Sequence, residues 1–239
     1  MLRLLASLIF CCFSALANSQ TALVELFTSQ GCSSCPPAEK LMTGLQQSVD
    51  SANAIILSFH VDYWNDLGWK DPFSRPEFAE RQRLYKQYGI SDGIYTPQLI
   101  INGKSAFTGG NGARLAREVT ALRQKTFPAL IVLNTETLTD GKLKINYTVS
   151  GTENECVMNF AIVTSGDTTE VKAGENVGKR LISVNTVRMF SYKLLEGKSG
   201  SIFMKLPDNV LLADLRLIVY AQNTSGAEVL GVAMKSLEN

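Results

Sequence analysis

Apolar positions in residues 21–125 follow two periods, which predict strands and helices in alternation. The runs 21–27 and 54–61 have the length and composition of buried strands. Between them, apolar residues recur at positions i, i+3, i+4 and i+7, as on one face of a helix. These residues are Ala38, Leu41, Met42 and Leu45. Because a helical crossover joins the two strands, we expect them to be parallel.

A second helix and a hairpin are predicted further along this region. Residues 74–77 have a capping-box sequence with proline in the first turn, which predicts a helix from there to about Gly89. Residues 95–101 are typical of a strand, and the pair Asn102-Gly103 predicts a hairpin with a short return strand. A last helix is indicated by Leu115, Val119 and Leu122. The prediction is a mixed sheet sandwiched by helices.

The pattern changes at residue 127. Apolar and polar residues alternate over 143–149, as in a half-buried strand, and more short strand-like runs follow between turn-forming residues. These runs are 157–163, 184–192, 201–206, 215–221 and 228–234. Such spacing favours an antiparallel β-sandwich. We therefore predict an α/β domain at residues 18–126 and an all-β sandwich-like domain at 127–239.

Residues 1–17 have the pattern of a secretory signal peptide. Arg3 precedes an apolar core, and Ala15-Leu16-Ala17 is a small-x-small cleavage site. The apolar stretch is short for a membrane span. We expect a periplasmic or secreted protein with no membrane anchor after cleavage.

Charge narrows the range of partners. The 239 residues carry a formal net charge of +1, and loss of Arg3 with the signal peptide would bring it to zero. A neutral chain is not expected to bind nucleic acid. A hydrophobic content of 45% is enough for a core that does not depend on disulfides.

Three cysteines lie outside the predicted signal peptide, and two of them suggest redox chemistry. Cys32 and Cys35 stand between a strand and a helix, three positions apart, as in thiol–disulfide exchange sites. A structural zinc site needs four ligands, and the chain has one histidine and no second such pair. We predict Cys32 as an exposed nucleophile near a helix N-terminus, Cys35 as the resolving thiol, and Cys156 as a buried residue.

The residues around the cysteines resemble a bacterial family of secreted, thioredoxin-like proteins of unknown function. The resemblance rests on 24–37, with its GCSSCPP motif, and on 60–64, 67–73, 95–98 and 174–179. It implies a thioredoxin-like N-terminal domain and a periplasmic setting, and it supplies no substrate. One departure from thioredoxins proper is that Gly31, not tryptophan, precedes Cys32.

Two further positions gain meaning from this resemblance. In thioredoxin-like proteins a cis-proline opens the third core strand, faces the dithiol and binds the substrate backbone. The resemblance thus implies substrate binding by Thr96 and Pro97, against the alternative of an ordinary trans-proline at a strand start. Trp64 lies in a segment, 62–71, that either forms an aromatic wall beside the dithiol or is a packed connector.

His60 leaves two interpretations open. It is the only histidine and follows a predicted strand, so a core histidine with a satisfied ring is the simpler one. Alternatively, His60 could join Cys32 and Cys35 in a Cu(I) site, since two thiolates and an imidazole suit that ion.

The leading functional hypothesis is a thiol–disulfide oxidoreductase that needs no cofactor and acts on protein or small-molecule thiols and disulfides. In this hypothesis the loop 174–180 of the second domain is the candidate for reaching the site. The alternatives are a Cu(I) carrier and a non-catalytic interaction module with a structural disulfide.

Overall fold

The computed structural model describes residues 21–48, 54–123, 125–152, 155–225 and 227–238; the predicted signal peptide lies outside them. The elements in chain order are β1 (Ala22–Thr28), α1 (Pro36–Gln47), β2 (Ala54–His60), α2 (Pro76–Gln87), β3 (Gln98–Ile101), β4 (Ser105–Thr108), α3 (Gly112–Leu122), β5 (Leu130–Thr137), β6 (Lys142–Ser150), β7 (Cys156–Glu170), β8 (Arg180–Leu194), β9 (Ser199–Lys205), the 3₁₀ helix η2 (Leu212–Asp214), β10 (Leu215–Asn223) and β11 (Val229–Ser236). No helix in these ranges is long and apolar enough to cross a bilayer.

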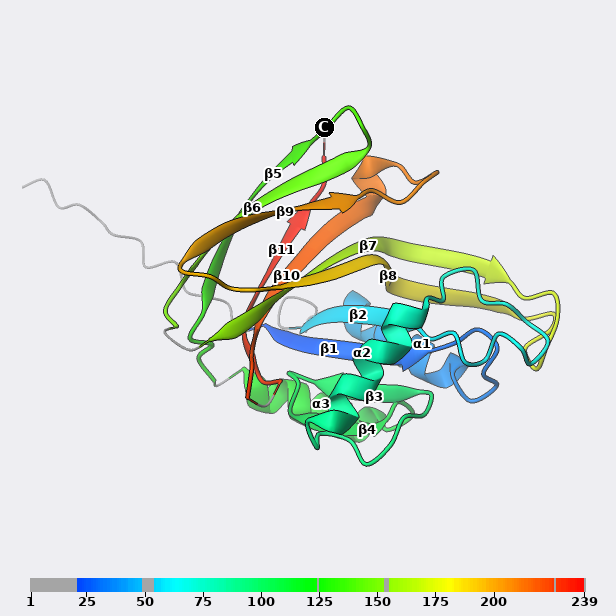
Figure 1. Ribbon diagram of the computed structural model, residues 1–239. Helices are drawn as coiled ribbons and strands as arrows, with labels where there is room; N and C mark the ends of the chain where they lie inside the picture. The colour runs from blue at the N-terminus through cyan, green and yellow to red at the C-terminus, as the bar shows by residue number, and fades with distance from the viewer. Residues whose placement is uncertain (1–20, 49–53, 124, 153–154, 226, 239) are drawn as a thin grey trace, which may run out of the picture.

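Eight strands form one mixed sheet, in the order β11-β10-β7-β8-β2-β1-β3-β4 (Figure 1). Strands β1 and β2 are parallel, as predicted, and β3 runs antiparallel to β1. The strand β8 joins β2 in parallel, with Ser58 opposite Thr186, and the Ser58 hydroxyl donates a hydrogen bond to the Val184 carbonyl (2.8 Å). The remaining strands form a three-stranded antiparallel sheet, β5-β6-β9.

The predicted mixed α/β class is confirmed, and the large sheet extends further than we expected. It crosses residue 126, where we placed the domain boundary, because β8 pairs with β2. The sequence pattern predicts only residues 157–163, in the first half of β7, and residues 184–192 of β8, whereas each strand has 15 residues. Residues 165–170 of β7 alternate between half-buried and exposed. The strand therefore continues beyond its apolar run as a more exposed segment.

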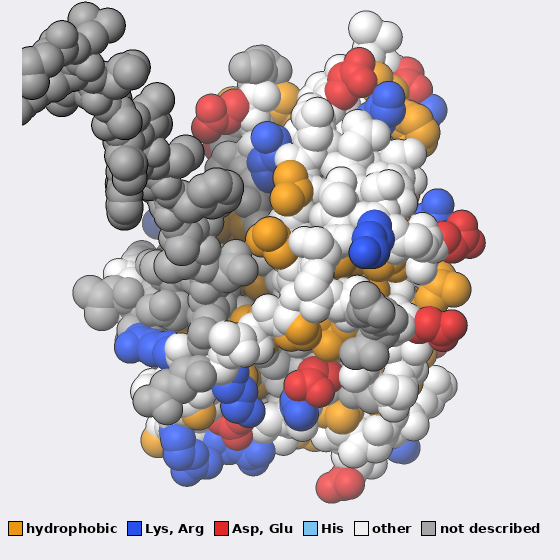
Figure 2. Space-filling view, turned by 90° about the vertical axis from the view of Figure 1, so that its left-hand side faces the viewer, with side chains coloured by type: hydrophobic (Ala, Val, Ile, Leu, Met, Phe, Trp, Pro, Cys, Tyr) orange, Lys and Arg blue, Asp and Glu red, His pale blue; other side chains and the backbone are white. Residues whose placement is uncertain are grey.

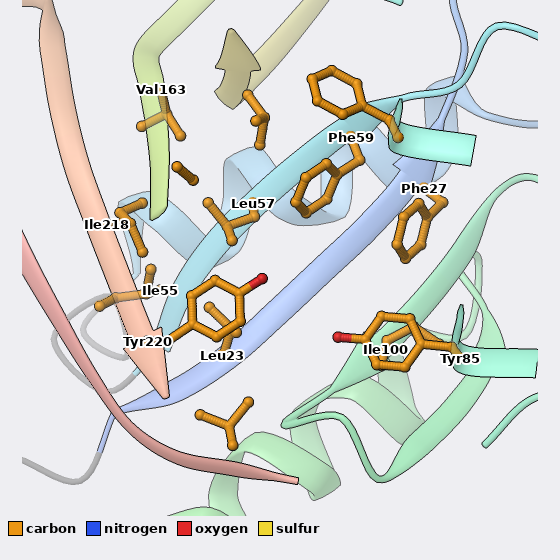
Figure 3. Close-up of a cluster of buried hydrophobic side chains, with 14 of the residues drawn as sticks. Leu23, Phe27, Ile55, Leu57, Phe59, Tyr85, Ile100, Val163, Ile218 and Tyr220 are labelled. Carbon is orange, nitrogen blue, oxygen red and sulfur yellow. The ribbon is translucent and has the colours of Figure 1, made fainter. Parts of the chain in front are cut away.

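Both faces of the sheet are covered around β1. Leu23 and Phe27 point into one cluster, which includes Phe78 and Tyr85 of α2. Figure 3 shows this cluster, with Leu57 of β2 beside Tyr220 of β10 and Phe59 of β2 nearer Phe27 of β1. Alternate β1 residues point to the opposite face, where α1 and α3 pack. This alternation is the period-2 pattern of a strand, and here both sets are buried and mainly apolar, with Glu25 the charged exception.

A third cluster lies between the β5-β6-β9 sheet and strands β7, β10 and β11. Ile145 and Tyr147 of β6 pack there with Phe160 and Leu217. Cys156 is free and buried in this cluster, which confirms the prediction for this residue. On the face shown in Figure 2, Lys and Arg side chains occur together with Asp and Glu side chains.

Local signals predict the end of α2 and the turn after β3, but not the N-cap of α2. Gly89, at φ +70°, follows α2, and the hairpin pair Asn102-Gly103 has positive φ at both residues. The capping box at 74–77 is wrong: the N-cap of α2 is Arg75, without a side-chain cap. Ser74 instead donates its hydroxyl hydrogen bond to the Asp71 carbonyl (2.8 Å), within the loop that precedes the helix.

Candidate redox site

The two cysteines lie in a tight loop between β1 and α1. Cys32 and Cys35 form a disulfide, with their Cα atoms 5.4 Å apart. The Cys35 amide donates to the Cys32 carbonyl (3.2 Å), and Cys35 is the N-cap of α1. Pro36 then occupies the first helical turn, where a missing N–H costs no intrahelical hydrogen bond. The sequence therefore places the pair at a strand-to-helix junction.

The expected exposure of Cys32 is wrong. Cys32 is 0% exposed and Cys35 is 1% exposed, whereas Ser33 and Ser34 between them are exposed. The Ser34 hydroxyl lies 3.2 Å from the Cys32 sulfur. Burial arises because segments that are distant in sequence cover the loop.

Thr96, Pro97 and Trp64 lie around this loop. The Thr96-Pro97 peptide bond is cis, as predicted. The indole N–H of Trp64 donates to the Thr96 hydroxyl (2.8 Å), and a Cβ atom placed on Gly31 would lie 3.3 Å from the Trp64 Cβ. Trp64 therefore lies between Thr96, which precedes Pro97, and Gly31, which precedes Cys32.

Pro97 also lies against the helix that carries Cys35. A Cβ atom placed on Gly109 would lie 2.8 Å from the Ala38 Cβ and 2.9 Å from the Pro97 Cβ. The Gly109 amide donates to the Pro97 carbonyl (2.9 Å). The chain thus brings Pro97 next to the first turn of α1, and only glycine fits at 109 without a displacement.

His60 lies in a buried group with two carboxylates. Its Nδ1 is 2.7 Å from Asp71 Oδ2, and its Nε2 is 3.9 Å from Glu39 Oε1. Asp71 also accepts hydrogen bonds from the backbone amides of Gln30 (2.8 Å) and Phe73 (2.9 Å). The simple interpretation of a satisfied core histidine holds for one ring nitrogen only, because Nε2 of His60 and Oε2 of Glu39 are buried without a hydrogen-bond partner.

Burial and mutual interaction move the pKa values of this group in different directions. Burial raises the pKa of Glu39, and the nearby His60 only partly opposes this. Burial acts to lower the pKa of His60, but Asp71 and then Glu39 outweigh it, so the pKa of His60 is raised. Burial acts to raise the pKa of Asp71, but His60 and the amide donors outweigh it, and the pKa of Asp71 is lowered. Glu39 and His60 therefore keep their protons to higher pH than usual, and Glu39 lies one helical turn after Cys35.

The structure does not place His60 as a third ligand for the sulfurs. Its two ring nitrogens face Asp71 and Glu39. Among the described residues, no group of three or more His, Cys, Asp or Glu side chains has an arrangement that could hold a metal ion. No observation favours the Cu(I) alternative.

The loop between β7 and β8 reaches the cysteines, as we expected for 174–180. The Asn176 side-chain amide donates to the carbonyls of Gln30 (2.9 Å) and Cys32 (2.8 Å). The Glu175 carboxylate accepts from the Ser33 amide (3.2 Å). Figure 1 shows the yellow tip of the β7–β8 hairpin beside the cyan loop that follows β2, and an added Cβ on Gly68 would lie 3.3 Å from the Gly174 Cα.

Three residues of this site are not among the predicted site residues: Glu39, Asp71 and Asn176. Asp71 and Asn176 lie inside the segments 67–73 and 174–179, which carry the family resemblance, so a signal for both is present in the sequence. Glu39 follows Cys35 by one helical turn, and its apolar neighbours in α1 do not distinguish it from an exposed glutamate.

Comparison with known proteins decides the family. The family described as "Protein of unknown function (DUF1223)" matches residues 23–222. The chain belongs to the DUF1223 family. No curated protein matches the sequence.

Solved structures share the fold of this DUF1223 protein. Protein AGR_C_4864 from Agrobacterium tumefaciens is similar with a TM-score of 0.68 and 26% identity, over 94% of this chain and 97% of the other. HBP35 of Porphyromonas gingivalis has a TM-score of 0.68 and 13% identity, over 92% of this chain and 76% of the other. The second likeness concerns the fold alone.

Proposed function

We propose that this DUF1223 protein is a periplasmic or secreted thiol–disulfide oxidoreductase that acts through Cys32 and Cys35. The observation that carries the proposal is the Cys32–Cys35 disulfide at the β1–α1 junction, with the cis Thr96-Pro97 pair beside α1. We further propose that the part of the fold from β1 to α3 is thioredoxin-like. The order of elements, with the dithiol before α1 and the cis-proline before β3, supports this.

In the reducing direction, the Cys32 thiolate attacks one sulfur of a substrate disulfide. A Cys32–substrate disulfide forms, and the other substrate sulfur leaves as a thiolate and takes up a proton. Cys35 then loses its proton and attacks the Cys32 sulfur, which closes the Cys32–Cys35 disulfide and releases the second substrate thiolate. The substrate gains two electrons and the dithiol loses two, and the reverse sequence oxidises a substrate dithiol.

Glu39 is the proposed acceptor of the Cys35 proton. It lies four residues after Cys35, and residues at this spacing are neighbours on a helix surface. Its amide donates to the Cys35 carbonyl (3.2 Å). Burial raises the pKa of Glu39, so its carboxyl takes up a proton more readily than an exposed glutamate does, while His60 stabilises the ionised form.

A non-catalytic module with a structural disulfide is the second candidate, and the burial of both sulfurs favours it. The two candidates differ in reduction potential. A value of about −120 to −270 mV, measured against glutathione with thiols trapped by mass tagging, supports catalysis. A value below about −300 mV supports the structural disulfide.

Turnover is the direct test of the proposal. Cys32→Ser should abolish reduction of a model peptide disulfide, and Cys156→Ser should retain it because Cys156 is buried in a different cluster. Equal turnover by Cys32→Ser and the parent protein would rule the proposal out.

A further inference from the structure

Asn176, in the C-terminal half of the chain, is hydrogen-bonded to the redox loop at the buried Cys32. The side chain is 0% exposed, and its amide group donates to the carbonyls of Gln30 (2.9 Å) and Cys32 (2.8 Å). Cys32 lies 144 residues away in sequence. Two donors from one distant side chain therefore satisfy the backbone just before and at the first cysteine.

We call the segment 171–179 the strap. Hydrogen bonds between residues near its two ends close it, and Asn176 within it contacts the redox loop. The Val171 amide donates to the Lys179 carbonyl (3.0 Å), and the Gly178 amide donates to the Val171 carbonyl (2.8 Å). The Lys179 ammonium group also donates to the Asn176 side-chain oxygen (2.8 Å). Asn176 is thus oriented from behind by Lys179 while its amide faces the redox loop.

The strap is hydrogen-bonded to the backbone of the loop that holds the buried Cys32. Ser33 and Ser34 are exposed, yet Cys32 is fully buried. An exchange reaction needs direct access of an attacking sulfur to a protein sulfur. We take the strap to be among the residues that must move for reaction at Cys32. Its movement leaves the Gln30 carbonyl without the Asn176 donor, and the Cys32 carbonyl keeps only the Cys35 amide.

We propose that Asn176 is a specificity-determining residue of the redox site, which selects thiols and disulfides carried on a peptide backbone over small ones. The inference rests on the proposed function. An extended peptide has backbone N–H groups that can donate to the Gln30 and Cys32 carbonyls when Asn176 leaves. A small dithiol such as dithiothreitol has no amide, so it reaches Cys32 only while the Gln30 carbonyl is unpaired and the Cys32 carbonyl has lost one of its two donors, which is costly for buried acceptors.

The test measures how fast two dithiols reduce the Cys32–Cys35 disulfide of the folded chain: dithiothreitol and a linear peptide with two cysteines. In both reactions the added dithiol becomes a disulfide and the two protein sulfurs become thiols, which are counted by mass tagging. Asn176→Asp and Asn176→Leu should each react about tenfold or more faster with dithiothreitol, as expected when two hydrogen bonds no longer hold the strap. The peptide rate should rise by a smaller factor.

Two further variants keep the test decisive. Val177→Ala changes the same strap at a side chain that is 61% exposed, and its rates should match those of the parent protein. Lys179→Met removes only the support behind Asn176 and should accelerate dithiothreitol by a few-fold, so it decides the question if the Asn176 variants do not fold.

Different outcomes separate this inference from the proposed function. An unchanged dithiothreitol rate in the folded Asn176 variants, or in Lys179→Met if those variants do not fold, overturns the inference. Equal acceleration of the two dithiols overturns the selectivity. If the parent protein fails to turn over peptide disulfides while the Asn176 variants still favour dithiothreitol as described, then the strap controls access and the proposed catalytic function is wrong.

Discussion

His60 and Asp71 form a pair without solvent contact, with 2.7 Å between Nδ1 and Oδ2 and side chains that are both 0% exposed. Asp71 connects this pair to the redox loop, because the same Oδ2 atom accepts from the Gln30 amide (2.8 Å). The pair therefore helps to position the backbone that leads into Cys32.

Asp71→Asn tests how much this pair contributes to the free energy of unfolding. The change removes the charge opposite His60 while it keeps the shape of the side chain. Loss of one partner of a buried pair should lower the free energy of unfolding by about 3–5 kcal/mol, measured by urea denaturation of the oxidised protein. Asp66→Asn is the matched control in the same loop, is exposed, and should change stability by less than about 0.5 kcal/mol. Equal effects of the two variants would contradict the pairing.

The pH dependence of stability follows from the raised pKa of His60. A group with a raised folded pKa contributes its full stability below the unfolded value and loses it as pH rises through the folded value. For His60 the decline should begin near its ordinary pKa of 6.5 and continue to its higher folded pKa. His60→Gln should flatten unfolding free energy against pH in that range.

The same pKa can be observed directly. The chain has one histidine, so an untagged protein gives one set of imidazole proton signals by NMR. Their titration midpoint should lie above 6.5. Asp71→Asn should lower the midpoint, since Asp71 is the largest influence that raises it. A midpoint below 6.5 in the parent protein would mean that burial dominates instead.

Local signals in the sequence predict the residues of the redox loop. We also expected the loop 174–180 to reach it, but not the burial of Cys32. The run 21–27, the two cysteines and the helical face after them determine the β1–loop–α1 unit, and each signal lies within a few residues of the element it predicts. The surroundings of Cys32 include Asn176, which donates to its carbonyl from a distant part of the chain. No local pattern reports a contact across 144 residues.

The extent of the large sheet was unpredictable for a related reason. Strands β7 and β8 are visible in the sequence as apolar runs, but the pairing of β8 with β2 depends on one parallel register at Ser58 and Thr186. Both residues are polar and buried, so hydrophobic periodicity gives no hint of the contact. The boundary at 126 therefore follows a change in pattern along the chain, not a break in the sheet.

A second buried ion pair gives a prediction away from the redox site. Arg81 of α2 donates from Nε to Glu25 Oε1 of β1 (2.6 Å), and Tyr85 and Tyr220 also donate to the Glu25 carboxylate. Arg81→Met leaves a buried charge on Glu25 and should cost about 3–5 kcal/mol of unfolding free energy. Adding Glu25→Gln to Arg81→Met should recover part of that loss.

The control for this pair is an exposed ion pair on the same helix. Arg83 contacts Glu80 at 2.6 Å, with side chains that are 42% and 70% exposed. Arg83→Met should change stability by less than about 1 kcal/mol, as is usual for exposed pairs. A double variant at Arg81 and Glu25 that is no more stable than Arg81→Met would show that the charge left on Glu25 is not the cause of the loss.

The hairpin glycine at 103 tests the contact between the two halves of the chain. Gly103 has φ +66°, and a Cβ atom there would lie 1.8 Å from the Ala227 carbonyl oxygen. Gly141 also has positive φ, +75°, but a Cβ atom there would meet nothing within 4 Å. Gly141→Ala should therefore cost only the backbone strain, about 1–2 kcal/mol. Gly103→Ala should cost clearly more, because the backbone near Ala227 must shift as well. Urea unfolding of the two variants side by side measures the difference, and equal losses would mean that the β3–β4 hairpin does not pack on this segment in solution.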